Sequence, residues 1–187
     1  MSKKKEPFTV DIEHNKLAIV ACYYTAIDAP YEDPGFTIWT LNQKTKVSEG
    51  KRIDAYFDLH DWATANYTAD YVEDIPWDTA GEVITTESYP YAEVFARYGY
   101  FWENSIPLML GLAGYRDFKS IYLFGCEAQE FIDTPKMGWS LFHVIGALRR
   151  EGRKVFFANE YAMDYSGIYG FKDMQKTQIP RRGFKFK

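Results

Sequence analysis

Five short runs of almost continuous apolar residues are the feature that most constrains how this chain can fold. They cover residues 16–23, 37–41, 55–59, 120–124 and 154–158. A strand that is exposed on one face alternates apolar and polar residues, whereas a strand buried on both faces is apolar throughout. The runs therefore predict the strands of a sheet that is covered on both faces, which is typical of a parallel sheet.

A helix is predicted over residues 104–113. Asn104 or Ser105 can cap its first turn, and Pro107 falls where the N–H that proline lacks is not needed. Gly114 follows as the expected stop signal.

Two further helices are expected. Residues 139–150 carry apolar side chains at helical spacing, namely Leu141, Val144, Ile145 and Leu148. Residues 91–99 predict a short helix whose common face would hold Ala92, Phe95 and Ala96. The stretch 62–86 is expected to hold a short helix and irregular chain. Strands that alternate with helices indicate an α/β protein, a three-layer Rossmann-like fold with a mostly parallel sheet and right-handed connections.

Length and composition indicate one domain. Of the 187 residues, 47% are hydrophobic and 34 are aromatic (14 Phe, 5 Trp and 15 Tyr), which is enough to bury a sizeable core. We assign residues 1–187 to a single Rossmann-like domain with a core at about 16–158 and flanking tails at 1–15 and 159–187.

Charge and cysteine content exclude several classes of protein. The 22 basic and 26 acidic residues give a net charge of −4, which argues against general nucleic-acid binding. Cys22 and Cys126 are far apart in sequence and lie in apolar runs, so both are expected to be core thiols in a reducing compartment. No apolar stretch approaches the ~20 residues of a membrane span. Residues 1–5 are basic but are followed by Glu6-Pro7-Phe8, which does not fit a signal peptide, so a cytoplasmic protein is expected.

The common catalytic and cofactor motifs are missing from the sequence. The segment after the first run, residues 21–27, contains neither G-x-G-x-x-G nor G-x-x-x-x-G-K, and there is no H-E-x-x-H or nucleophile elbow. We therefore predict no metal and no cofactor.

Polar residues follow several of the predicted strands and begin one predicted helix. The carboxyl ends of parallel strands open on one edge of the sheet, which is where such folds bind ligands. The candidate ligand-binding residues are Tyr24, Thr25, Asn42, Asp58, Asn104, Ser105 and Glu127. Tyr24 is included because an aromatic ring can stack on a nucleobase, and Asn104 and Ser105 because a helix N-terminus favours anions. The alternative interpretation is that each residue only caps a turn or a helix.

His60 is the candidate catalytic residue. It follows the run at 55–59 and has Asp58, Asp61 and Trp62 as near neighbours in sequence. A neighbouring carboxylate can orient an imidazole for acid–base chemistry or for contact with a phosphate. The alternative is a histidine that is hydrogen-bonded within a loop.

Several segments in this order resemble a family of small bacteriophage Rossmann-like proteins. They are residues 17–42, 55–62, 101–128 and 139–150, with Tyr89-Pro90 between them. More remotely, the arrangement is similar to sialyltransferase-like and motility-accessory-factor-like glycosyltransferases, which bind nucleotide-sugars.

This resemblance implies a Rossmann-like fold with a nucleotide-type ligand at the carboxyl ends of the strands. It nominates Thr25, Asn42, His60, Asn104, Ser105 and Glu127. The chain departs from the family where small residues of the first loop are replaced by Ala21 and by Tyr23-Tyr24, and where Cys126 displaces the acidic residue to Glu127.

The first functional hypothesis is a phage-type protein that binds a nucleotide or a nucleotide-derived ligand and acts on it as a transferase or hydrolase. A second hypothesis is a non-catalytic sponge that sequesters a signalling nucleotide of host defence in the host cytoplasm. A third is a structural or host-protein-binding role, for which the basic tail at 181–187 would offer a docking segment. A homo-oligomer is compatible with each of them.

Overall fold

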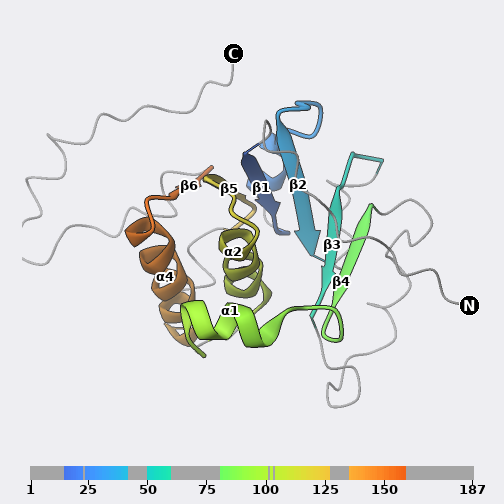
Figure 1. Ribbon diagram of the computed structural model, residues 1–187. Coiled ribbons are helices and arrows are strands. Elements are labelled where there is room, and N and C mark those ends of the chain that lie inside the picture. The colour runs from blue at the N-terminus through green and yellow to red at the C-terminus, as the bar shows by residue number, and fades with distance from the viewer. Residues whose placement is uncertain are drawn as a thin grey trace, which may run out of the picture.

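The described part of the chain forms one sheet of six parallel strands. The computed structural model describes residues 15–22, 24–41, 50–59, 81–100, 102, 104–126 and 135–158. The strands are β1 (Lys16–Val20), β2 (Phe36–Leu41), β3 (Ala55–Asp58), β4 (Glu82–Thr85), β5 (Ser120–Phe124) and β6 (Lys154–Phe157). Their order is β4-β3-β2-β1-β5-β6, and every neighbouring pair is parallel (Figure 1). The predicted α/β fold with a parallel sheet is confirmed.

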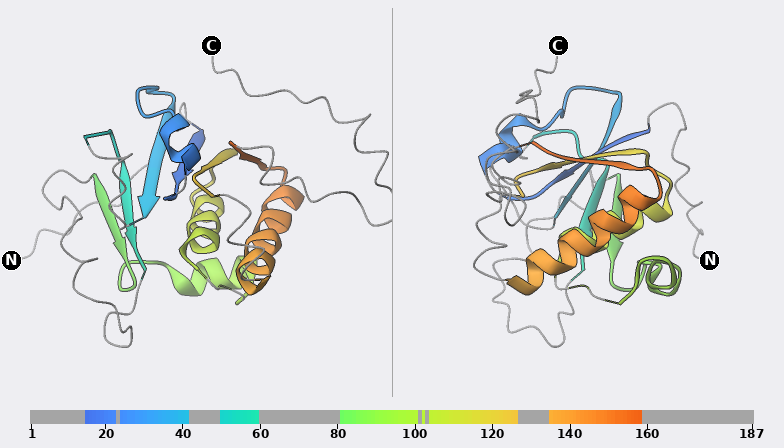
Figure 2. Two further views of the ribbon diagram at one scale, coloured as in Figure 1. Left: turned by 180° about the vertical axis from the view of Figure 1, so that it is seen from behind. Right: turned by 90° about the vertical axis from the view of Figure 1, so that its left-hand side faces the viewer.

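Helices cover both faces of this sheet. They are the 3₁₀-helix η1 (Tyr24–Asp28) and the α-helices α1 (Tyr91–Tyr98), α2 (Ser105–Tyr115) and α4 (Pro135–Arg150). Helices α2 and α4 pack on one face, and α1 lies beyond them on the side away from the sheet (Figure 2). The opposite face is covered by η1 and the loop that follows it. The layers are therefore α-helices, sheet, and η1 with its loop.

The central strand β1 is buried on both faces, which explains its uninterrupted apolar sequence. Leu17 and Ile19 belong to the core beneath the α-helices, whereas Ala18 and Val20 belong to the core beneath η1. All four side chains are fully buried. Because successive residues of a strand point to opposite faces, both sets have to be apolar.

The direction in which the chain adds successive strands to the sheet reverses at β1, although all the strands remain parallel. The connection through η1 leads from β1 to β2 on one face, and the connection through α4 leads from β5 to β6 in the opposite direction on the other face. Opposite directions on opposite faces give both connections the same hand, as the rule for parallel sheets requires. After the carboxyl end of β1 the chain consequently passes to one face of the sheet, and after the carboxyl end of β5 it passes to the other face.

Helix α2 is buried along almost its whole length. Its residues are apolar nearly all round, as is usual for a helix that packs between a sheet and other helices. The Asn104 side chain caps it by accepting the Ile106 N–H at 3.0 Å, as predicted. The predicted stop at Gly114 is wrong, because the helix continues to Tyr115.

Two glycines of α2 permit close packing with its neighbours. A Cβ atom on Gly111 would lie 2.8 Å from Val94 Cγ1 of α1. A Cβ atom on Gly114 would meet the Tyr98 hydroxyl of α1 and would lie 2.5 Å from Leu148 Cδ2 of α4. Gly114 therefore serves close helix packing rather than helix termination.

Strand β4 was not predicted. It occupies residues 82–85, within the stretch 62–86 for which a short helix and irregular chain were expected. It has only four residues, lies at the edge of the sheet and buries only Ile84, so it lacks the continuous apolar pattern of an inner strand. Residues 62–80 of that stretch lie outside the described residues.

The predicted inner face of the helix at 91–99 is wrong in part. Ala92 and Ala96 are exposed and Phe95 is half-buried, whereas Val94 and Tyr98 are buried. The helix turns this face inward because its neighbour is the glycine-bearing surface of α2.

All described elements lie between Lys16 and Phe157, inside the predicted core of residues 16–158. The tail at 159–187, and all but Asn15 of the tail at 1–15, lie outside the described residues. Of the helices that the structure describes, none combines the length and the apolar character that crossing a bilayer demands.

Replacing Gly114 and Gly146 by alanine will have opposite effects on stability. Gly114→Ala should lower the free energy of unfolding by about 1–3 kcal/mol, because the added methyl group overlaps Tyr98 and Leu148. Gly146→Ala should raise it by up to about 1 kcal/mol, because Gly146 is exposed on α4 with open space around its Cα and alanine favours helix. Urea unfolding of both variants tests this, and equal effects would contradict the packing role of Gly114.

Candidate functional site

The strongest candidate site is the carboxyl edge of the sheet between β1 and β5. We call this place the switch point and define it as residues 21, 22, 24–26 and 125–126. Open α/β sheets bind their ligands outside the carboxyl ends of the strands, where the strand order reverses. In this chain the reversal falls between β1 and β5.

Thr25 and Gly125 meet at the switch point. The Thr25 Oγ1 accepts the Gly125 N–H at 2.7 Å, and this contact is buried. Gly125 has φ of +65°, and a Cβ on it would lie 2.8 Å from the Ala21 carbonyl oxygen and 3.1 Å from Ala26 Cβ. Only glycine fits this backbone at such close approach. The sequence prediction placed Thr25 at this edge, and in the structure its hydroxyl binds the backbone N–H of Gly125 there.

The other predicted site residues are distributed along the same edge. Asp58 is the last residue of β3 and is buried. Strand β2 separates β3 from β1, so at about 4.8 Å per strand the backbone of Asp58 lies about 10 Å from that of β1.

Asn104 and Ser105 begin helix α2, and the cap interpretation holds for Asn104. The helix ends beside the amino end of β5 and is 11 residues, or about 16 Å, long. Its N-terminus therefore lies toward the carboxyl edge of the sheet.

Four candidates have side chains that the structure does not describe. Tyr24 is the first residue of η1, and only its backbone is described. Asn42, His60 and Glu127 lie outside the described residues. They follow β2, β3 and β5 in the sequence, and their roles remain predictions.

The two cysteines were missed as a pair. Both were expected in the core, but Cys22 is exposed and only Cys126 is buried. They follow β1 and β5, which are adjacent strands, so both lie at the switch point. A spacing of more than a hundred residues hides this neighbourhood in the sequence.

Several aromatic residues that could have offered rings to a ligand stack on one another instead. Phe95 of α1 stacks on Trp102 with ring centroids 5.4 Å apart and meets Tyr100 edge-on at the same separation. The Trp102 indole N–H donates to the Gly99 carbonyl oxygen at 2.5 Å. Phe95 and Trp102 also pack against the core beneath the α-helices, and Trp102 lies against Gly111 of α2.

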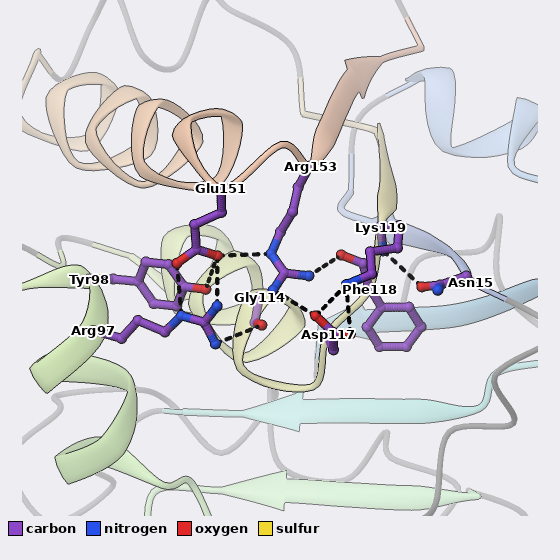
Figure 3. A network of polar contacts seen from close by, with 9 residues as sticks. All are labelled: Asn15, Arg97, Tyr98, Gly114, Asp117, Phe118, Lys119, Glu151 and Arg153. Atoms are coloured by element: carbon purple, nitrogen blue, oxygen red, sulfur yellow. Dashed lines mark hydrogen bonds and ion pairs between the residues drawn. The ribbon is translucent and has the colours of Figure 1, made fainter.

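A second polar cluster lies at the opposite, amino-terminal edge of the sheet (Figure 3). Its centre is Arg153, which precedes β6 and has a side chain only 4% exposed. The Arg153 guanidinium donates from Nε to Glu151 at 2.9 Å, from one terminal nitrogen to the Phe118 carbonyl oxygen at 2.6 Å and from the other to Asp117 at 2.9 Å. Two carboxylates and a buried carbonyl thus compensate its charge.

Glu151 connects this cluster to helix α1. Arg97 donates to its carboxylate at 2.8 and 2.9 Å, and the Tyr98 hydroxyl donates at 3.0 Å. Burial raises the pKa of the Glu151 carboxyl, but the hydrogen bonds from Arg97, Arg153 and Tyr98 outweigh it, so the pKa lies below its usual value. Burial and the hydrogen bond to Glu151 raise the pKa of Tyr98 to about 12.

We interpret the cluster at the amino edge as a structural feature, and we call its residues Asn15, Arg97, Tyr98, Asp117, Lys119, Glu151 and Arg153 the clamp. Asn15 Oδ1 accepts the Lys119 N–H at 2.8 Å, and Lys119 and Arg153 both donate to Asp117, which lowers the pKa of that carboxyl. The cluster therefore joins residues that precede β1, β5 and β6 to the ends of the helices, and its charges compensate one another.

Within the described ranges, no three His, Cys, Asp or Glu side chains gather as metal ligands would. No protein-family model, curated protein or solved structure matches this chain.

Removal of the Thr25 hydroxyl will destabilise the switch point. Thr25→Val leaves the Gly125 N–H without its acceptor in a buried place and should cost about 1–3 kcal/mol of unfolding free energy. Thr25→Ser keeps the hydroxyl and should cost about 1 kcal/mol or less. Urea unfolding checks the pair, and a Ser variant as unstable as the Val variant would refute the hydrogen-bond role.

Arg153 and Lys119 both donate to Asp117 but differ in burial, so their alanine variants will differ in stability. Arg153→Ala should lower the free energy of unfolding by about 3 kcal/mol, because it removes one of the donors to Glu151 and the guanidinium that binds the buried Phe118 carbonyl. Lys119→Ala should change it by no more than about 0.5 kcal/mol, because its side chain is 55% exposed. Equal losses in thermal or urea unfolding would show that burial does not determine how much these contacts contribute to the free energy of unfolding.

Proposed function

We propose that this protein binds a nucleotide or a nucleotide-derived small molecule at the switch point. The observation that carries the proposal is the strand order, which reverses between β1 and β5. Open α/β sheets generally bind their ligands at such a point. The nucleotide class comes from the sequence resemblance and from fold-level analogy. The proposal concerns binding, and the chemistry of His60 is not part of it.

The two edges of the sheet support this choice. At the amino edge, the charged groups of the clamp are engaged with one another. At the carboxyl edge, β1 and β5 are followed by the small residues Ala21 and Gly125, and their backbones approach each other closely. The departure from the glycine-rich motif means that a diphosphate cradle of the dinucleotide type is not expected.

Ile27 offers a clean way to test the location. It lies in η1, two residues after Thr25, and is 71% exposed, so a charge at this position is compatible with the fold. A phosphate at the switch point would be repelled by Ile27→Asp and attracted by Ile27→Lys. Ala96→Asp, on the exposed side of α1, is the control.

The experiment begins with thermal unfolding of the full-length protein in the presence of ATP, GTP, UDP-glucose, NAD and a cyclic dinucleotide. A bound ligand at about 100 times its Kd should raise the free energy of unfolding by about 2.7 kcal/mol. For that ligand, calorimetry should show a Kd about threefold to tenfold weaker for Ile27→Asp, no weakening for Ile27→Lys and no change for Ala96→Asp.

Two results would overturn the proposal. One is that none of these nucleotides stabilises the protein, and the other is that a nucleotide binds with the same Kd in both Ile27 variants. Mass spectrometry of the recovered ligand would then distinguish binding from conversion: an intact ligand fits the sponge hypothesis, and a product fits a transferase or hydrolase.

A further inference from the structure

The two cysteines occupy equivalent positions at the ends of adjacent strands. In the β1–β5 ladder the last Cα partners are Val20 and Phe124. Cys22 and Cys126 each lie two residues beyond that pair. They therefore follow the last ladder pair by the same number of residues on adjacent strands.

One hydrogen bond joins the two chains just beyond the ladder. The Ala21 N–H donates to the Phe124 carbonyl oxygen at 2.8 Å, which extends the pairing by one residue. The positions of Ala21 and Gly125 are in direct contact, since a Cβ on Gly125 would lie 2.8 Å from the Ala21 oxygen. Neighbouring strands are about 4.8 Å apart, and disulfides join residues whose Cα atoms are about 4.4–6.8 Å apart. The spacing of adjacent strands is therefore within the range of Cα separations that a disulfide can join.

The two thiols differ in exposure in a way that suits stepwise oxidation. Cys22 is exposed, whereas Cys126 is only 6% exposed. The Cys126 thiol donates to the Phe124 carbonyl oxygen at 3.5 Å, which holds it at the end of β5. An oxidant in solution therefore reaches Cys22 first, and Cys126 is the less accessible of the two thiols.

We propose that Cys22 and Cys126 form an intramolecular disulfide when the reduced protein meets a small-molecule disulfide such as glutathione disulfide. The Cys22 thiolate attacks one sulfur of the oxidant, which forms a mixed disulfide and releases one glutathione thiolate. The Cys126 thiolate then attacks the Cys22 sulfur and expels the second glutathione. Two thiol protons are released, and two electrons reduce the oxidant to two glutathione molecules. The bond would tie β1 to β5 across the switch point, and the inference does not depend on ligand binding.

The test is oxidation of the full-length protein by glutathione disulfide, followed by alkylation and mass spectrometry without reduction. The expected product has lost two hydrogens, resists alkylation at both cysteines and yields one cross-linked peptide that contains Cys22 and Cys126. The Cys126→Ser variant should instead accumulate a glutathione adduct on Cys22. The Cys22→Ser variant should keep Cys126 as a thiol, because burial protects it.

A comparison with unfolded protein separates the role of the fold from the mere presence of two thiols. In urea the chain between the cysteines is an open loop, so the equilibrium constant for disulfide formation should be at least tenfold lower than in the folded protein. The inference is overturned if the folded wild type stops at the Cys22 adduct, if it forms only dimers linked through Cys22, or if the two equilibrium constants are equal.

Discussion

Burial of β1 on both faces and along both edges is the constraint on which the rest of the structure depends. The strand is hydrogen-bonded to β2 on one side and to β5 on the other, and Leu17 to Val20 are fully buried. A strand in this position needs covering layers on both faces. The α-helices supply one layer and η1 with its loop supplies the other, so the chain must leave the carboxyl end of β1 toward one face and that of β5 toward the opposite face. The switch point is the direct result.

The two edges of the sheet are held together by different kinds of contact. At the amino edge, Arg153 links Glu151, Asp117 and the Phe118 carbonyl, and Glu151 reaches on to α1. A buried guanidinium is tolerated because each of these contacts offsets its desolvation. At the carboxyl edge the contacts are short hydrogen bonds and backbone packing around Gly125. The described contacts at the amino edge are thus mainly between charged side chains, and those around Gly125 involve the backbone.

Part of the candidate site could be predicted from local sequence. Thr25 follows a buried run and Asn104 precedes a helical pattern, so both could be assigned to the ends of elements, and Asn104 does cap α2. The Thr25 contact with Gly125 could not be predicted, because it joins residues that are 100 positions apart. The cysteine pair was misjudged for the same reason: Cys22 stands in an apolar run, yet the chain turns into η1 just after it and exposes its side chain.

The sequence alone determined the parallel α/β architecture, because an apolar run without alternation is stable only as a strand covered on both faces. It also determined the long helices, whose caps and apolar spacing are local properties. The order of the strands, the partner of each helix and the edge strand β4 were decided by long-range packing. Gly114 shows why: a glycine in an apolar segment is locally a helix stop, and only the presence of Tyr98 and Leu148 against it makes it a contact surface.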